Sequence, residues 1–220
     1  MTTLAEISRQ IEDAAVRLEG VASLTPLQRN DRLSARTGAE VWLKREDLQP
    51  VRSYKLRGAY NLIAQLKPEE RAAGVVCASA GNHGQGVAWA CAHLGIKGRI
   101  FVPATTPRQK RDRMIVLGGD MVELVVAGDT YDESSKLASR AATESGAILV
   151  PAFDDPRTIA GQGTVAVELA RQFADAEVMY VALGGGGLIA GMAAYWKSLR
   201  PQIEFVACSP VASPAMLSTD

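Results

Sequence analysis

The sequence has no excess of charge of either sign. Its 220 residues contain 24 Lys and Arg and 24 Asp and Glu, so the formal net charge at pH 7 is zero. Proteins that bind nucleic acid or an anionic membrane through their overall field carry a basic surplus. The basic run at residues 108–113 is interrupted by Asp112 and contains no aromatic residue, and we interpret it as a solvated helix face. We therefore expect no nucleic acid and no membrane among the partners.

Cysteine and histidine are scarce. Cys77, Cys91 and Cys208 form an odd set without CxxC spacing. Each lies in an apolar run, which favours buried, reduced thiols and a cytoplasmic location. The two histidines, His83 and His93, have no Cys or carboxylate cluster at ligand spacing, so we expect no metal site on them.

Long uninterrupted apolar helices are also missing. The uncharged stretch at 178–196, VMYVALGGGGLIAGMAAYW, has the length of a membrane helix but carries four consecutive glycines. Each would cost about 1 kcal/mol in a helix interior, so the stretch is predicted to be a strand, a glycine loop and a new helix. The amino terminus carries Glu6, Glu12 and Asp13 where a signal peptide would be apolar, and it is predicted to be an amphipathic helix.

From Gly38 onward, short β-rich runs alternate with segments of helical period. Strands are predicted at 39–46, 74–79, 97–103, 120–126, 147–151, 178–183 and 203–209. Helices are predicted at 4–18, 53–66, 82–94, 107–117, 130–145, 156–173 and 187–199. Several strands are apolar almost throughout, as in parallel strands covered by helices on both faces. The pattern predicts an α/β fold.

Lys55 is the first candidate for chemistry, because it opens a predicted helix in the segment SYKLRGA. Its charge faces the positive end of the helix dipole, and partial burial would lower its pKa further. A lysine of lowered pKa suits a Schiff-base nucleophile or a general base. The alternative is a solvated lysine on a basic helix face.

The second candidate segment, SAGNHGQGVA, lies between a predicted strand and helix. It begins with Ser79, Ala80, Gly81, Asn82 and His83. Small residues beside free N–H groups at a helix start form a pocket for an anion such as a carboxylate. Alternatively, Ser79 or Asn82 is an N-cap and the glycines serve close packing. Ser79 is not part of a GxSxG motif, so a hydrolase nucleophile is not supported.

The third candidate segment, GGGGLIAG, contains Gly184, Gly185, Gly186 and Gly187 followed by Leu188. Glycines at a helix start can direct successive N–H groups toward a phosphate. The loop also matches the G-x-G-x-x-A pattern of dinucleotide-binding proteins, but the next predicted strand ends in Cys208 and Ser209 rather than an acidic residue.

A lysine nucleophile, a carboxylate pocket and a phosphate loop together suit a phosphorylated aldehyde condensed with an amino acid. SYKLRGA, SAGNHGQGVA and GGGGLIAG, in this order, resemble the pyridoxal-phosphate enzymes of fold type II, most closely the threonine dehydratases (threonine deaminases). The resemblance extends from Thr25 to about Val206 and includes AGQGT at 160–164. It implies two parallel-rich sheets flanked by helices, as in the tryptophan synthase β-like fold.

The resemblance implies a division into domains and a set of roles. Residues 1–54 and 154–220 would form a larger pyridoxal-phosphate-binding domain, without the carboxy-terminal part of the catalytic domain, and 55–153 a smaller one. Lys55 would be the Schiff-base residue and the Cα proton base, and Asn82 would bond the ring 3′-oxygen. The phosphate would be held by Gly184, Gly185, Gly186, Gly187 and Leu188. The substrate carboxylate would be surrounded by Ser79, Ala80, Gly81, Asn82 and His83.

The implied reaction is β-elimination and deamination of L-threonine to 2-oxobutanoate and ammonia, with L-serine giving pyruvate, by a homo-oligomer in isoleucine biosynthesis. Serine dehydratase or racemase chemistry, and a catalytically silent ligand-binding paralogue, stay as alternatives. Ala80 stands where serine racemase has a serine. Ser209 and Ala215 stand where such relatives carry acidic metal ligands, so no metal site is expected.

Overall fold

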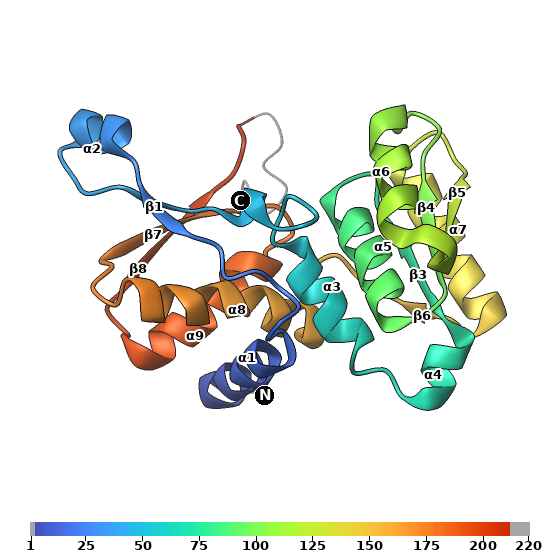
Figure 1. Cartoon of the computed structure of the whole chain (residues 1–220), viewed down its shortest axis with the longest axis horizontal. Coiled ribbons are helices and arrows are strands. Elements are labelled where there is room, and N and C mark those ends of the chain that lie inside the picture. The colour runs from blue at the N-terminus through green and yellow to red at the C-terminus, as the bar shows by residue number, and fades with distance from the viewer. Residues whose placement is uncertain (1–2, 212–220) are drawn as a thin grey trace, which may run out of the picture.

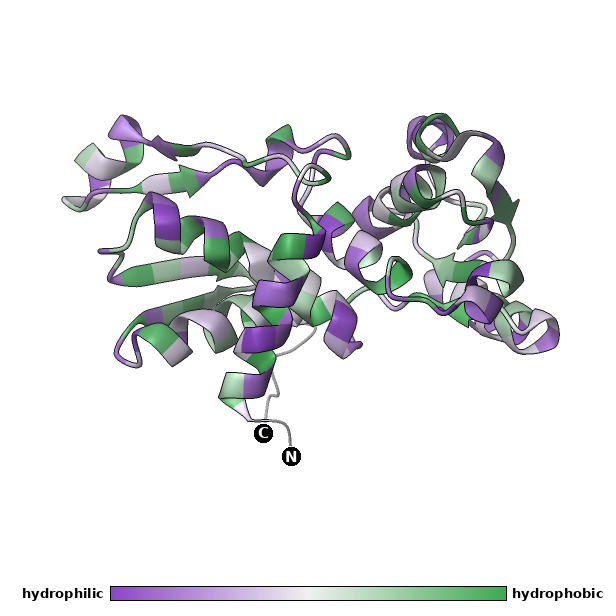
Figure 2. Cartoon of the chain, turned by 60° about the horizontal axis from the view of Figure 1, so that its bottom comes forward, coloured by the Kyte–Doolittle hydropathy of each residue, from purple (hydrophilic) through white to green (hydrophobic). Residues whose placement is uncertain are grey.

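The structure, a computed structural model, describes residues 3–211 and consists of two lobes with helix α3 (Lys55–Ile63) between them (Figure 1). The lobe at the right of Figure 1 contains the parallel sheet of four strands, and the lobe at the left contains a parallel sheet of two strands. Helices cover the sheets, and Figure 2 shows apolar residues concentrated on the strands and on the inner faces of these helices. This arrangement confirms the predicted α/β class.

The right-hand lobe is built on four parallel strands in the order β5-β4-β3-β6. The strands are β3 (Val75–Ala78), β4 (Gly98–Val102), β5 (Val122–Val126) and β6 (Ile148–Leu149). They are flanked by α4 (Pro68–Ala73), α5 (Asn82–Leu94), α6 (Arg108–Gly118), the 3-10 turn η2 (Gly119–Met121) and α7 (Tyr131–Ser145). Its core contains Ile63, Val75, Val87, Ile100 and Met114, all buried. Because α3 contributes to this core, the lobe and α3 are packed as one unit.

The left-hand lobe is built on the parallel pair β7 (Val178–Ala182) and β8 (Glu204–Cys208). It contains α1 (Leu4–Arg17), α8 (Pro156–Gln172) and α9 (Gly187–Leu199), whose buried residues form its core with Met179 and Val181. A small antiparallel sheet of β1 (Leu27–Arg29) and β2 (Trp42–Lys44), the helix α2 (Asp31–Thr37) and the 3-10 turn η1 (Glu46–Leu48) complete it.

Every predicted helix and strand overlaps an observed one, and the apolar stretch at 178–196 is confirmed as a strand, a glycine loop and a helix. Sequence reasoning missed β1, α2 and α4. None of the residues of α2 or α4 is buried, so these helices carry no apolar period. The strand predicted at 39–46 is shorter than expected and pairs antiparallel with β1, outside the parallel sheets.

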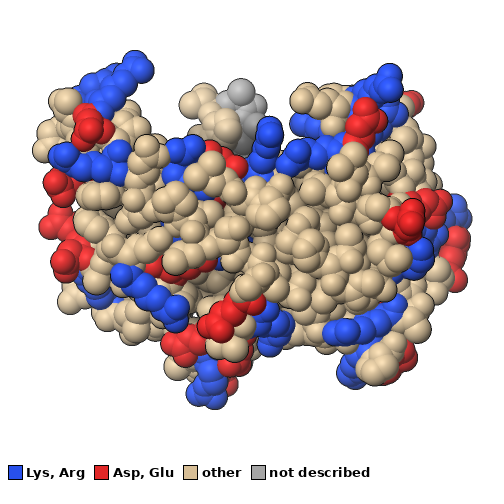
Figure 3. Space-filling view, viewed as in Figure 1, with Lys and Arg blue, Asp and Glu red and all other residues tan. Residues whose placement is uncertain are grey.

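Two further expectations need correction. Cys77 and Cys91 are buried as predicted, but Cys208 is exposed, at the end of strand β8, which pairs only with β7 among the described residues. The basic face of α6 is only partly solvated, since Arg113 donates to the Gln85 side chain at 3.0 Å and to the Pro50 carbonyl at 2.9 Å. In Figure 3, basic and acidic groups are interspersed around the rim of the viewed face. No helix within residues 3–211 is long and apolar enough to cross a membrane.

Glycines allow the central helices to pack at close range. A Cβ at Gly161 of α8 would lie 2.6 Å from the Gly58 Cα of α3, so neither position has room for a side chain. Gly86 of α5 faces the Lys55 carbonyl, where a Cβ would lie 2.9 Å from the oxygen. Direct backbone contact of this kind fixes how deeply α3 sits between its neighbours.

Arg52, three residues before Lys55, has a left-handed backbone with φ of 57°, although it is not a glycine. The left-handed conformation costs an ordinary L-residue about 1–2 kcal/mol. Its side chain is exposed and makes no hydrogen bond or ion pair within the described residues, so no side-chain bond offsets this cost. The backbone N–H of Arg52 does donate to the Gln49 carbonyl at 2.7 Å, a bond that any residue at this position could make.

We predict that Arg52→Gly is more stable than Arg52→Ala by about 1 kcal/mol, because both remove the same side chain and only glycine adopts the left-handed backbone without strain. Urea unfolding of the two variants measures the difference. If the two variants had the same urea midpoint and the same dependence of unfolding free energy on urea concentration, the prediction would be wrong.

Candidate active site

Lys55 occupies the first position of α3, as predicted, and its side chain is half-buried. Its Nζ donates a hydrogen bond to the Ala152 carbonyl at 2.8 Å. Burial lowers the pKa of Lys55 below its ordinary value. Among residues 3–211, no acidic side chain bonds to Nζ, so no ion pair there opposes this shift. Burial therefore shifts Lys55 toward the neutral amine, relative to an exposed lysine.

The second candidate segment leads directly into α5. The N-cap of this helix is Gly81, and no side chain caps it. The Ser79 hydroxyl accepts a bond from the Gly81 N–H at 3.2 Å within the turn. The Asn82 side chain is exposed and makes no hydrogen bond within the described residues. The interpretation of Ser79 or Asn82 as a simple N-cap is therefore wrong, and the first N–H groups of α5 have no side-chain partner.

His83 is buried directly after this turn. Its Nε2 lies 2.9 Å from the Val150 carbonyl, which can only accept, so Nε2 carries the proton and Nδ1 is an acceptor. Nδ1 is buried and has no partner among the described residues. Burial, opposed by the Val150 hydrogen bond and reinforced by nearby Lys55, lowers the pKa of His83 to about 4. The ring is therefore neutral at pH 7.

The third candidate segment leads into α9 through Gly186, which has φ of 85° and is an N-cap without a side-chain hydrogen bond. A Cβ at Gly185 would lie 2.2 Å from the Phe153 ring, and one at Gly187 would lie 3.1 Å from the Phe153 Cα. Gly184 faces open space. The Leu188 side chain packs on the left-hand core, so only its backbone can face a phosphate.

One segment contacts all three candidates. Residues 150–153, which follow β6, accept the bonds from His83 and Lys55 and pack on the glycine loop through Phe153. Sequence reasoning missed this role. The resemblance places only a domain boundary in the PAFDDP turn at 151–156, between residues 153 and 154. The turn's position at the carboxyl end of a parallel strand was the available signal, since ligand sites gather there.

The site thus combines a desolvated amine with two helix N-termini that no side chain caps. Such N-termini attract anions through free N–H groups and the helix dipole. The chain matches the family model described as "Pyridoxal-phosphate dependent enzyme" over residues 18–220. The chain belongs to this family of pyridoxal-phosphate dependent enzymes.

Relatives within the family match most of the chain. The "L-threonine dehydratase biosynthetic IlvA" of Mycobacterium tuberculosis (strain H37Rv) is 54% identical over 209 residues, covering 94% of this chain and 49% of the relative. The protein of the same name from Bacillus subtilis (strain 168) is 43% identical and covers 96% of this chain and 50% of the relative. The chain therefore spans about half the length of these curated relatives.

Solved structures of the family agree with the fold. The processed form of threonine deaminase isoform 2 from Solanum lycopersicum matches with a TM-score of 0.88 and 41% identity, covering 94% of this chain and 56% of that one. Maize serine racemase matches with a TM-score of 0.89 and 31% identity, and the match covers 93% of this chain and 61% of the racemase chain. The predicted fold type II architecture is confirmed.

The residues present fit pyridoxal phosphate. Lys55 offers an amine of lowered pKa for the aldehyde, and the uncapped start of α9 beside the open space at Gly184 offers N–H groups for a phosphate. Within residues 3–211, no group of three or more Cys, His, Asp or Glu could hold a metal ion. The prediction for Ala215 lies outside the described residues.

We predict that His83 makes stability depend on pH. Because its folded-state pKa is lowered from about 6.5 to about 4, the unfolded chain takes up a proton first as the pH falls. Above about pH 6.5, the titration of His83 does not change the free energy of unfolding. As the pH falls from about 6.5 to about 4, this free energy decreases by about 1.4 kcal/mol per pH unit. Urea unfolding across this range measures it. His83→Gln, which keeps an N–H donor but does not titrate, should show a smaller slope, and equal slopes would refute the prediction.

For the glycine loop, we predict that Gly186→Ala lowers the free energy of unfolding by about 1 kcal/mol, because alanine is strained at this φ. The change also turns the first N–H groups of α9, so pyridoxal-phosphate affinity should fall about tenfold. Thermal unfolding and cofactor titration measure the two effects. Gly184→Ala is the control for stability, since its Cβ meets open space, and a comparable loss of stability there would contradict the strain argument.

Proposed function

We propose that this chain contains the lysine, the carboxylate pocket and the phosphate loop of a threonine dehydratase, an ammonia-lyase that converts L-threonine to 2-oxobutanoate and ammonia and L-serine to pyruvate. The observation that carries the proposal is that the Lys55 amine and the uncapped start of α9 meet on one segment, at Ala152 and Phe153. The names and identities of the Mycobacterium and Bacillus relatives support this substrate class.

Each part of the site would have a separate task. The backbone N–H groups of Gly184, Gly185, Gly186, Gly187 and Leu188 would hold the cofactor phosphate. The segment from Ser79 to His83, which leads into α5, would surround the substrate carboxylate, and the free N–H groups at the start of that helix would bond it. The exposed Asn82 side chain would bond the cofactor ring oxygen. Buried His83 presents only a neutral ring, so it adds no charge that would compete for the carboxylate.

Lys55 would take the Cα proton of the substrate. Its desolvation favours the neutral amine, the form that can accept a proton, and the Ala152 carbonyl offers its ammonium a partner afterwards. Pyridoxal phosphate, when bound, supplies the electron sink that makes this proton acidic enough to remove. Loss of the β-hydroxyl as water, followed by uptake of water and release of ammonia, balances L-threonine against 2-oxobutanoate.

A racemase-type reaction is the second candidate, because the maize serine racemase structure has a TM-score of 0.89 against 0.88 for the threonine deaminase structure, although its sequence identity is lower, 31% against 41%. Racemisation needs a second proton-transferring group on the opposite side of the substrate. Ala80, which follows Ser79 in the carboxylate pocket, has no group that could transfer a proton. We therefore favour elimination. Chiral analysis of substrate recovered from the reaction decides between the two, because racemisation would produce the opposite configuration at Cα and elimination would not.

The proposal includes the division into two domains, one of residues 1–54 and 154–220 and the other of residues 55–153. It also includes a homo-oligomeric state and a cytoplasmic location. The separate cores of the two lobes support the division. Its boundary at Lys55 coincides with the start of α3, which packs against both lobes.

The central prediction concerns Lys55. Borohydride reduction with pyridoxal phosphate should fix the cofactor on the Lys55 peptide, and Lys55→Ala should abolish the labelling. The reason is that this desolvated amine bonds Ala152, the neighbour of Phe153, which packs on the glycine loop. Peptide mass spectrometry measures it. Exposed Lys67→Ala is the matched control and should label normally. Labelling of another lysine in Lys55→Ala would overturn the assignment.

Turnover is tested by 2-oxobutanoate release from L-threonine. The assay uses the chain alone and the chain joined to the part of the Mycobacterium relative that it does not cover. Activity in either form that is lost in Lys55→Ala supports the proposal. Labelled Lys55 without turnover in both forms would instead support a ligand-binding protein.

A further inference from the structure

Arg57 lies two residues after Lys55 in α3, and its side chain is only 1% exposed. Residues two apart in a helix project to nearly opposite sides. Arg57 therefore anchors the side of α3 that faces away from the Lys55 amine. A fully buried arginine needs partners for its charge and its donors, because an unpaired buried charge is very costly.

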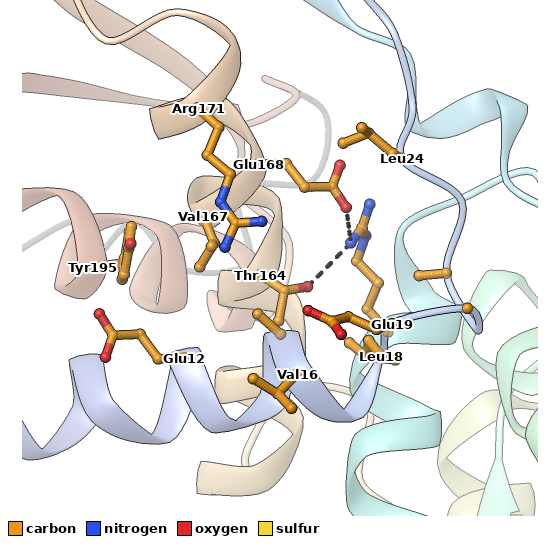
Figure 4. A pocket seen from close by; sticks show the side chains of 14 residues that line it. Glu12, Val16, Leu18, Glu19, Leu24, Thr164, Val167, Glu168, Arg171 and Tyr195 are labelled. Carbon is orange, nitrogen blue, oxygen red and sulfur yellow. Dashed lines mark hydrogen bonds and ion pairs between the residues drawn. The ribbon is translucent and has the colours of Figure 1, made fainter.

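The partners of Arg57 come from two other elements. Glu46 of η1 accepts two bonds, from Nε at 2.9 Å and from Nη2 at 2.8 Å, so this pair is bidentate. Glu168 of α8 accepts from Nη1 at 2.7 Å, and the Thr164 hydroxyl accepts from the same nitrogen at 3.2 Å. The last two bonds are the dashed lines in Figure 4. The guanidinium plane is thus fixed in orientation as well as position.

Lys44 completes a buried ion cluster, defined here as Lys44, Glu46, Arg57 and Glu168. Its Nζ donates to Glu168 at 2.5 Å and to the Thr25 carbonyl at 2.7 Å. Burial acts to raise the pKa of Glu46, but the Arg57 bonds outweigh it and lower the pKa below its ordinary value. The cluster holds two cations and two anions, so it is neutral as a whole. Such clusters add little net stability compared with apolar packing, but they specify geometry.

Apart from the bonds of the Lys55 amine and the Arg57 guanidinium, the first turn of α3 has one directional hydrogen bond to a neighbouring element among the described residues: the Gly58 N–H donates to the Gln162 side chain of α8 at 3.2 Å. That bond is longer than the Arg57 bonds to Glu46 and Glu168 and joins two uncharged groups. The N-cap of α3, Tyr54, makes no side-chain capping bond. Gly86 and Gly58 allow close approach to α5 and α8, but a glycine contact limits depth more than rotation. The bidentate, charged Arg57 fork is therefore the stronger of the two hydrogen-bonded restraints on rotation of the first turn.

We propose that Arg57 is a positioning residue for Lys55: by gripping Glu46 and Glu168 it sets the rotation of the first turn of α3 and so directs the lysine amine toward Ala152 and the glycine loop. The inference rests on the proposed function of Lys55. On this proposal the buried ion cluster orients Lys55, in addition to holding η1 and α8 against α3.

A cavity of about 460 Å³ gives experimental access to this cluster. Figure 4 shows it between α1, α8 and α9, with the Arg57 bonds to Thr164 and Glu168 on its wall. A guanidinium ion entering Arg57→Ala can therefore occupy the place of the lost group. Arg171 lines the same cavity and makes no hydrogen bond or ion pair within the described residues, so Arg171→Ala is the matched control.

The first measurement uses the cofactor-free chain. Acetylation of Lys55 by acetic anhydride, followed by peptide mass spectrometry across pH, reports the reactivity of this single amine. Removing Arg57 leaves the Glu46 and Glu168 carboxylates without their arginine partner close to α3 and lets the first turn of this helix rotate. The pH at which Lys55 becomes reactive toward acetic anhydride should therefore rise. A role in overall stability alone would leave the profile of the folded variant unchanged.

The second measurement is the rate of borohydride-trapped pyridoxal-phosphate attachment at Lys55. We expect Arg57→Ala to slow it about tenfold or more, since a misplacement of about 1 Å can cost about 100-fold. Millimolar guanidinium should restore most of the rate, whereas urea, which is similar in shape but neutral, should not. Arg171→Ala should behave as the parent chain with or without guanidinium.

Arg57→Lys guards against a variant that fails to fold, because it keeps the buried charge but loses the fork. The proposal predicts a folded protein with an altered Lys55 profile and slower attachment. Parent-like behaviour of folded Arg57→Lys, or equal recovery of Arg57→Ala in guanidinium and urea, would overturn the inference. Failure of the parent chain to attach the cofactor would overturn the proposed function, while the acetylation profile still decides whether Arg57 positions Lys55.

Discussion

The close crossing of α3 and α8, where Gly58 faces Gly161, is the contact on which the rest of the structure depends. A Cβ at either position would collide with the opposite helix. Because α3 also packs on α5 through Gly86, this crossing brings the right-hand lobe to the left-hand lobe close to Lys55. The glycines of the middle of the chain thus have a packing role, separate from the loop glycines that would bind a phosphate.

The site is made largely of backbone. Two helices begin at glycine N-caps that no side chain satisfies, and residues 150–153 supply carbonyl groups to Lys55 and His83. Backbone groups are held in place by the helices and strands that contain them, so they need little reorganisation when charge is bound. The family membership and the geometry therefore agree on an anion-binding site beside an amine.

Burial sets the protonation state of the ionisable groups around this site. Lys55 and His83 both have lowered pKa values because desolvation penalises their charged forms. Arg57 is buried more deeply, yet stays charged because two carboxylates surround it. On one side of α3, burial thus disfavours the charged forms of Lys55 and His83, whereas the opposite side carries a balanced set of charges.

The sequence by itself determined the elements and the motifs. Apolar periodicity and the glycine and proline positions identified the longer helices and strands, because these signals act over a few residues. The same local chemistry identified Lys55 at a helix start and the glycine loop before α9. Short elements without buried residues, such as α2 and β1, left no such pattern.

The tertiary structure decided what depends on contacts between distant residues. Phe153 packs on the glycine loop, the Ala152 carbonyl meets Lys55, and Arg57 joins Glu46 to Glu168 across more than a hundred positions of the chain. The exposure of Cys208 was likewise decided by its place at the end of β8 and not by its apolar neighbours. Burial and partnership are properties of the packed chain, since local sequence fixes which face of an element is apolar but not which surface will cover it.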